Sequence, residues 1–206
     1  MAPRSPRCAH LLVVALGLLP AVGLLARFLF GDGLGADSIE TITHSTGAWT
    51  LRLLLLTLAV TPARKILGWR RIAPFRRTLG LLAFGCACLH LATWLALDQL
   101  FDWQAMGEDV AKRRYITVGL AAFLCLVPLA ATSSHRAVRR LGRRWVALHR
   151  LVYLAAVCDV VHYTWQVKAD LRGPALYGAT LAVLLAFRLA EARKRRGSRR
   201  ATAPRR

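Results

Sequence analysis

The sequence of 206 residues has few charged side chains, and acidic ones are the scarcest. Charged residues make up 19% of the chain, with 10 Asp and Glu against 30 Lys and Arg, while 56% of the residues are hydrophobic. Soluble domains usually carry about 25% charged residues. A net charge of +20 would suit a nucleic-acid-binding protein, but no soluble stretch is long enough to build a basic face, so nucleic acid is excluded as a partner. The composition predicts an integral membrane protein.

Signatures of soluble redox and metal proteins are also lacking. The cysteines show no disulfide or zinc-binding spacing, and they lie in or beside apolar blocks, where thiols behave as small buried hydrophobes. They are Cys8, Cys86, Cys88, Cys125 and Cys158. No G-x-G-x-x-G unit follows a strand, so we expect no soluble flavin or nicotinamide domain.

Long apolar blocks are what the sequence has in abundance, and a helix needs about 20 apolar residues to cross a bilayer. Six blocks approach this length, at residues 9–30, 48–67, 79–97, 115–131, 145–165 and 175–190. The second is the weakest because Arg52 lies inside it and Pro62 kinks or ends it, which leaves five as the alternative count. We predict an all-α bundle of about six transmembrane helices, with loops at 32–47 and 98–114.

The basic residues divide unevenly between the two sides of such a bundle. Loops and chain ends on one side hold 22 Lys and Arg, against 5 on the other side. Short cytoplasmic loops are rich in Lys and Arg, so both termini are predicted to be cytoplasmic, as an even number of spans requires. Residues 1–206 are expected to form a single transmembrane domain. Its basic tail at 191–206 is expected to contact anionic lipid headgroups.

Three histidines lie inside the apolar blocks: His90 in the third, and His149 and His162 in the fifth. Ionisable side chains within a membrane are functional candidates by default. Counted at about 1.5 Å per residue from Arg77 and Arg144, the three imidazoles lie roughly 20, 8 and 27 Å deep. A haem held by two imidazoles needs one from each of two helices at similar depth. We therefore predict a b-type haem with His90 and His162 as the axial ligands of its iron.

Other interpretations of these histidines stay open. His90 and His162 could hydrogen-bond between helices in a haemless scaffold or carrier, and a visible spectrum without a Soret band would favour that alternative. His149 lies at the shallow end of its span. It is a candidate contact for a quinone headgroup, a flavin phosphate or lipid, together with the neighbouring arginines. These arginines are Arg76, Arg77 and Arg150.

An ordered set of short segments gives the sequence a family resemblance. The segments are TGAWTLRLLLLTLAVTP at 46–62, FRRTLG at 75–80, His90, KRRYITVG at 112–119, PLAATS at 128–133, LGRRWVALHRLVY at 141–153 and HYTW at 162–165. Together they cover most of the chain from about Thr46 to Tyr177. The set resembles the MsrQ family, haem-binding membrane subunits of the bacterial periplasmic methionine sulfoxide reductase system, within the ferric-reductase-like transmembrane group.

The resemblance implies a role in electron transfer at the bacterial inner membrane, with haem b and FMN as cofactors. Electrons would pass from the quinone pool to MsrP, a periplasmic molybdopterin enzyme that reduces methionine sulfoxide in oxidised proteins. Catalytic groups for that reduction would lie on the partner, and this chain would have none. His90 and His162 match the family's haem histidines, and His149 matches its third membrane histidine.

The wider group often binds two stacked haems. Here Arg76 and Arg77 occupy the positions where a second ligand of an inner haem would precede His90, which argues against a second haem. A ferric-reducing or oxygen-reducing relative of the same group is the nearest alternative, and it would differ only in its electron acceptor.

Overall fold

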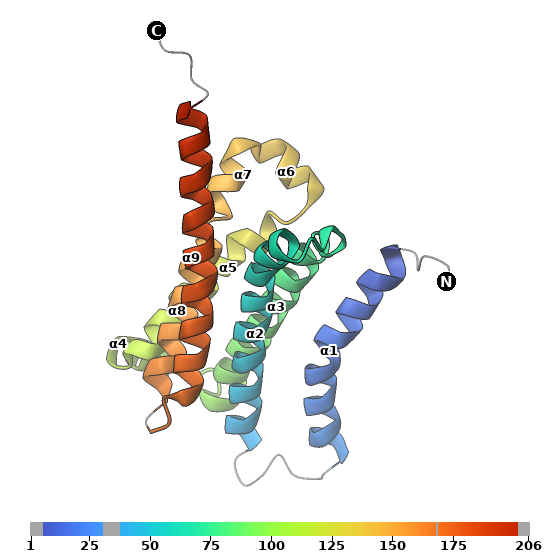
Figure 1. Ribbon diagram of the computed structural model, residues 1–206. Helices are drawn as coiled ribbons and strands as arrows, with labels where there is room; N and C mark the ends of the chain where they lie inside the picture. Colours follow the sequence, from blue (N-terminus) through green and yellow to red (C-terminus); the bar gives the residue numbers. More distant parts are fainter. Residues whose placement is uncertain (1–5, 31–37, 168, 202–206) are drawn as a thin grey trace.

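The computed structural model describes residues 6–30, 38–167 and 169–201, and this part of the chain consists of helices and the turns between them (Figure 1). The long helices are α1 (Pro6–Phe30), α2 (Ser38–Ile66), α3 (Phe75–Thr93), α5 (Arg114–Ala131), α8 (Leu151–Gln166) and α9 (Arg172–Ala201). The short ones are η1 (Arg70–Ile72), η2 (Trp94–Asp98), α4 (Trp103–Lys112), α6 (His135–Leu141) and α7 (Arg143–Leu148). The prediction of an all-helical bundle is confirmed.

Helices long and apolar enough to cross a membrane make up most of the fold. There are 5 such segments among the described residues, namely Ser38–Ile66, Phe75–Asp98, Arg114–Ala131, Arg143–Gln166 and Arg172–Lys194. Helix α1 adds a shorter apolar stretch, Cys8–Leu24, and packs against α3 and α2. Most leucines of α1 are exposed, as lipid-facing side chains are. The chain is therefore a multi-pass membrane protein.

The helices differ in extent from the apolar blocks of the sequence. Residues 38–47, expected in a loop, form the first turns of α2, and this helix continues past Pro62. Much of the stretch 98–114, also expected as a loop, is helix α4. Helix α9 continues to Ala201, through part of the expected tail. Outside the described residues lie 1–5, 31–37, 168 and 202–206, and with them Arg4, Asp32, Asp37 and Lys168.

Helix α2 is the most buried of the membrane-spanning helices, with α3, α8 and α9 packed around it. Its leucines Leu51, Leu54 and Leu58 share one core with alanines of α3 and α8. Small side chains let membrane helices approach closely, and those of this core are Ala83, Ala87, Ala155 and Ala156. Helix α5 pairs with α8 along the other side of the bundle. The packing brings α3 and α8 into one bundle although they are far apart in the sequence.

The two ends of the bundle differ in charge. The Pro6 end of α1, helices α6 and α7, and the Ala201 end of α9 all lie in the upper half of Figure 1, and the short helix η1 follows the upper end of α2. Basic residues are concentrated in the turns and short helices there, between 64 and 77 and between 135 and 150. We call this the basic end. Helix α4 lies near the opposite end (Figure 1).

Candidate functional site

Two of the three membrane histidines lie side by side inside the bundle. His90 comes from α3 and His162 from α8, and their ring centroids are 6.0 Å apart with the ring planes at 80°. Two imidazole nitrogens that each bind one metal ion at about 2 Å place the ring centroids on the order of 6 Å apart. The spacing of the pair is compatible with two imidazoles that bind a single metal ion.

Backbone carbonyls fix the orientation of both rings. Nδ1 of His90 lies 2.9 Å from the carbonyl oxygen of Thr43, and Nδ1 of His162 lies 2.7 Å from that of Tyr115. A carbonyl oxygen only accepts, so each Nδ1 must carry the hydrogen and donate it. Neutral histidine then has its lone pair on Nε2, which is the arrangement of a metal-binding imidazole with an outer-shell carbonyl partner.

Two glycines leave room for the histidine rings. A Cβ atom on Gly47 of α2 would lie 3.0 Å from Cε1 of His90, and one on Gly119 of α5 would lie 2.6 Å from Nδ1 of His162. Real Cβ atoms essentially never approach another atom as closely as the second distance. The absence of a side chain at Gly119 therefore allows His162 to reach the Tyr115 carbonyl.

The substitution Gly119→Ala is expected to displace His162 and weaken binding of the predicted haem by about 10-fold or more, the usual cost of losing an outer-shell partner. Alanine favours a helix over glycine, so a loss would come from the contact with the ring. Haem content of the purified protein, read from the Soret band, is the measurement. Gly85→Ala on α3 is the control, because a Cβ there meets nothing within 4 Å. Equal haem content in both variants would contradict the prediction.

The histidine pair lines a cavity of about 630 Å³, which we call the histidine cavity. This volume lies within the range of about 300–1,000 Å³ that small-molecule and cofactor sites occupy. Apolar side chains from α2, α3, α5 and α8 form most of its wall, among them Leu51, Leu54, Ala87, Leu120, Ala122, Phe123, Leu126 and Ala155. The cavity therefore offers a largely apolar space with two imidazoles.

The sequence count placed His162 about 27 Å deep, roughly 7 Å beyond His90. The fifth apolar block is not one straight helix, because α7 ends at Leu148 and α8 begins at Leu151. Helices α6 and α7 form an arch at the basic end (Figure 1). Residues of α7 thus do not add their full rise to the depth of His162, so the count overestimated the mismatch.

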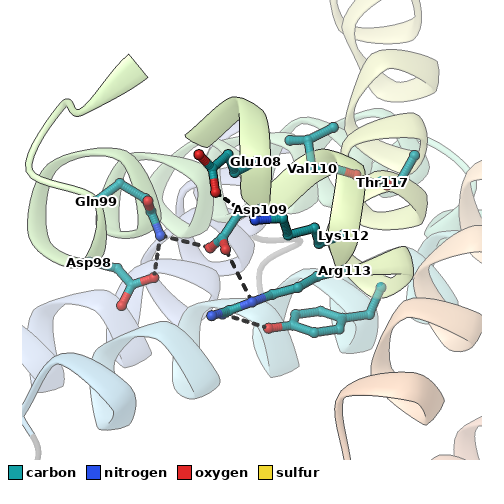
Figure 2. A network of polar contacts seen from close by, with 9 residues as sticks. Asp98, Gln99, Glu108, Asp109, Val110, Lys112, Arg113 and Thr117 are labelled. Carbon is teal, nitrogen blue, oxygen red and sulfur yellow. Dashed lines mark hydrogen bonds and ion pairs between the residues drawn. The ribbon is translucent and has the colours of Figure 1, made fainter. Parts of the chain in front are cut away.

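A polar network at the end opposite the basic end holds the connection from η2 to α5 (Figure 2). Asp109 accepts from Gln99 Nε2 at 2.9 Å and pairs with Arg113 Nε at 3.1 Å. Arg113 Nη1 in turn donates to the Tyr115 hydroxyl at 3.4 Å, and Thr117 donates to the Val110 carbonyl at 2.6 Å. The network anchors the start of α5, which supplies the carbonyl partner of His162.

A second cavity of about 930 Å³ lies at the basic end. We call it the basic-end cavity. Arg76, Arg77 and His149 line it, and so do Trp145 and His135. Arg150 does not belong to its lining. Of the four candidate contacts for a quinone or a flavin phosphate, the structure thus brings three to one cavity.

Local contacts hold His149 in a different tautomer from that of His90 and His162. Its ring stacks on Trp145 with centroids 3.9 Å apart, and its Nε2 lies 3.2 Å from the Thr132 hydroxyl oxygen. That hydroxyl donates its hydrogen to the Pro128 carbonyl at 2.6 Å, so it accepts from Nε2–H of His149. Neutral His149 therefore has its lone pair on Nδ1, the opposite tautomer from His90 and His162.

Two charged residues of membrane-spanning helices belong to the histidine cavity although the sequence predicted no function for them. Arg52 only weakened the prediction of the second span, and Asp159 carried no prediction. Both line the cavity, and Oδ2 of Asp159 is buried with no hydrogen-bond partner among the described residues. The rule that membrane ionisable residues are functional candidates would have identified both.

Comparison with known proteins identifies a family for most of the chain. The family described as "Ferric reductase like transmembrane component" matches residues 46–159 of this chain. This match contains His90 of α3 and both histidine-contacting glycines, and it ends three residues before His162.

Curated relatives extend the similarity over nearly the whole chain. A protein of Rhodospirillum rubrum is 53% identical over 95% of this chain and 94% of its own length. Proteins of Azospira oryzae and Herminiimonas arsenicoxydans are 49% and 48% identical over 92% and 90% of this chain, and over 82% and 86% of their own lengths. All three are described as the protein-methionine-sulfoxide reductase heme-binding subunit MsrQ. The chain therefore belongs to the MsrQ family of the ferric-reductase-like transmembrane group.

Proposed function

We propose that this protein is the haem b-containing electron-transfer subunit of a methionine sulfoxide reductase system in the bacterial inner membrane. It passes electrons from the quinone pool to a periplasmic molybdopterin reductase of the MsrP type, which repairs oxidised proteins. The description that its relatives share supports the haem and the reductase system. The observation that carries the proposal is the 6.0 Å separation of the His90 and His162 rings.

The residues of the histidine cavity fit a haem held by two imidazoles. His90 and His162 come from two different helices, as ligation on both faces of one macrocycle requires. Each has its Nε2 lone pair available, because Nδ1 donates to a backbone carbonyl. A haem b bound there supplies a one-electron carrier inside the membrane. An oxidised protein cannot enter between the membrane helices, so the sulfoxide chemistry belongs to the partner.

The basic-end cavity is where electrons enter. Arg76 and Arg77 line it beside His149. Guanidinium groups bind phosphate and carbonyl oxygens strongly, so these residues suit the phosphate of FMN or the headgroup of a quinone. Arg150 lies in the same turn region but outside the lining, so we assign it no contact with either molecule.

The charge of the two ends sets the direction of transfer. The basic end faces the cytoplasm, because Lys and Arg mark cytoplasmic loops. His162 precedes the last residue of α8, Gln166, by about 6 Å of helix. The histidine pair thus lies toward the periplasmic side, where an external reductase can accept electrons. The basic-end cavity lies on the donor side.

The function is tested by following the haem spectrum of the full-length protein in lipid nanodiscs. We expect a quinol to reduce the haem, and an MsrP-type reductase with methionine sulfoxide to reoxidise it at least about tenfold faster than ferric citrate or oxygen does. A protein without a Soret band after haem supply would indicate a haemless scaffold. Faster reoxidation by ferric citrate or oxygen would indicate a different acceptor.

A further inference from the structure

Arg52 is a charged residue in the interior of a membrane-spanning helix. It lies midway between Ser38 and Ile66, the two ends of α2. A charge at this depth is costly unless it faces a cavity or a partner, so such residues are rare in spanning helices and usually functional. The electron-transfer path described above gives Arg52 no role.

The protein provides neutral contacts for Arg52. Its Nε donates to the Tyr177 hydroxyl of α9 at 2.8 Å, and its guanidinium carbon lies 5.0 Å from the ring centroid of Trp49. None of the ion pairs among the described residues includes Arg52. These contacts use Nε and the face of the guanidinium. They do not involve the terminal nitrogens Nη1 and Nη2, a pair that can bind a carboxylate in a bidentate manner.

The charge distribution around the histidine cavity makes Arg52 distinctive. Among the described residues that line it, Arg52 is the only Arg or Lys, whereas the acidic ones are Glu40, Asp98 and Asp159. Gly47, which contacts the His90 ring, lies about 7 Å from Arg52 along the α2 axis. An anionic group at the edge of a flat ligand between the two histidines is thus within reach of Arg52, and Arg52 is the cationic side chain of the described lining that can attract it.

Haem b carries two propionate groups, and a carboxylate inside a membrane is very costly without a cationic partner. We propose that Arg52 binds a haem propionate through its terminal nitrogens, while Tyr177 and Trp49 hold the guanidinium in place. The inference rests on the proposed haem site. In this inference, Arg52 fixes how the macrocycle is rotated about the axis between the two histidines.

The test measures how one substitution in the protein changes the binding of two ligands that differ only in the charge of their propionate groups. Full-length haem-free protein is titrated with haem b and with its dimethyl ester, whose propionates carry no charge, and the Soret band reports the dissociation constants. We expect Arg52→Gln to weaken binding of haem b by about 10- to 100-fold, the value of a charge-assisted bidentate contact, and to leave binding of the ester nearly unchanged.

Arg188→Gln is the matched control. Arg188 is also a membrane arginine, and it lies beside the Leu58 carbonyl and the Tyr153 ring, outside the lining of the histidine cavity. This variant should discriminate between haem b and the ester as the wild type does. If Arg52→Gln fails to fold, Tyr177→Phe removes the hydrogen bond to Arg52 and should lower the discrimination roughly fivefold.

An unchanged ratio of the two dissociation constants in Arg52→Gln would overturn the inference, and so would an equal loss for haem b and ester. If Tyr177→Phe replaces it, an unchanged ratio has the same meaning. Failure of the proposed haem site is distinguishable, because wild-type protein would then bind neither haem b nor the ester. If the His90→Ala protein binds neither haem b nor the ester, this result supports the haem site independently of Arg52.

Discussion

Purified His90→Ala and His162→Ala proteins are expected to lose the haem Soret band that the wild type shows. Each substitution removes one of two imidazoles whose rings are 6.0 Å apart. Most of the remaining cavity wall consists of apolar side chains. Loss of an outer-shell partner alone costs about 10- to 100-fold in metal affinity, so loss of a ligand should cost more than about 100-fold. Redox difference spectra of membranes and of purified protein measure it.

His149→Ala is the matched control for the two ligand variants. His149 is also a membrane histidine, but it lines the basic-end cavity and stacks on Trp145. We expect this variant to keep at least part of the haem signal. If alanine at His90 or His162 leaves the protein as strongly coloured as the wild type, the metal centre is not between these two residues.

The Arg77→Ala protein is expected to bind haem normally. The rate at which a quinol or a flavin-linked donor reduces this haem should fall about tenfold or more. Arg77 lines the basic-end cavity, and removal of an arginine that binds a phosphate or carbonyl group costs one or more charge-assisted hydrogen bonds. Stopped-flow absorbance of the haem and the flavin content of the purified protein are the measurements. Arg76→Ala should have the same direction of effect.

Arg150→Ala provides the comparison for the arginine variants. Arg150 carries the same charge in the same region of the chain, but it does not line the basic-end cavity. It should reduce its haem at the wild-type rate. Full flavin content and full quinol-linked reduction in Arg77→Ala would show that electrons do not enter through this cavity.

Much of the fold could be predicted because membrane helices leave a strong signal. Long apolar blocks predicted α3 and α5 within about four residues at each end, whereas the block at 145–165 divides into α7 and α8, so that only the end of α8 was predicted closely. The extent of α2 could not be predicted, because Ser38–Gly47 is polar enough to resemble a loop and becomes helical within the packed bundle. Amphipathic α4 was not predicted for a similar reason, since a helix of 10 residues contains no long apolar block.

The candidate site was partly predictable. His90 and His162 were selected because imidazoles are rare and costly inside a membrane, and the structure brings them together. Gly47 and Gly119 gave no such signal, because a glycine shows its role only when the ring that it accommodates is in place. The separation of Arg150 from Arg77 also depended on where α7 turns into α8.

The sequence by itself determined that the chain crosses the membrane repeatedly, which side holds the basic residues and which histidines lie in apolar surroundings, because hydrophobicity and charge are local properties. Tertiary structure alone decided that the histidine rings are 6.0 Å apart, which nitrogen of each ring keeps a lone pair, and that Arg52 lines the same cavity. These features depend on the bend before α8 and on close packing of α2, α3, α5 and α8. Distances between segments far apart in the sequence are set by packing, and no single segment encodes them.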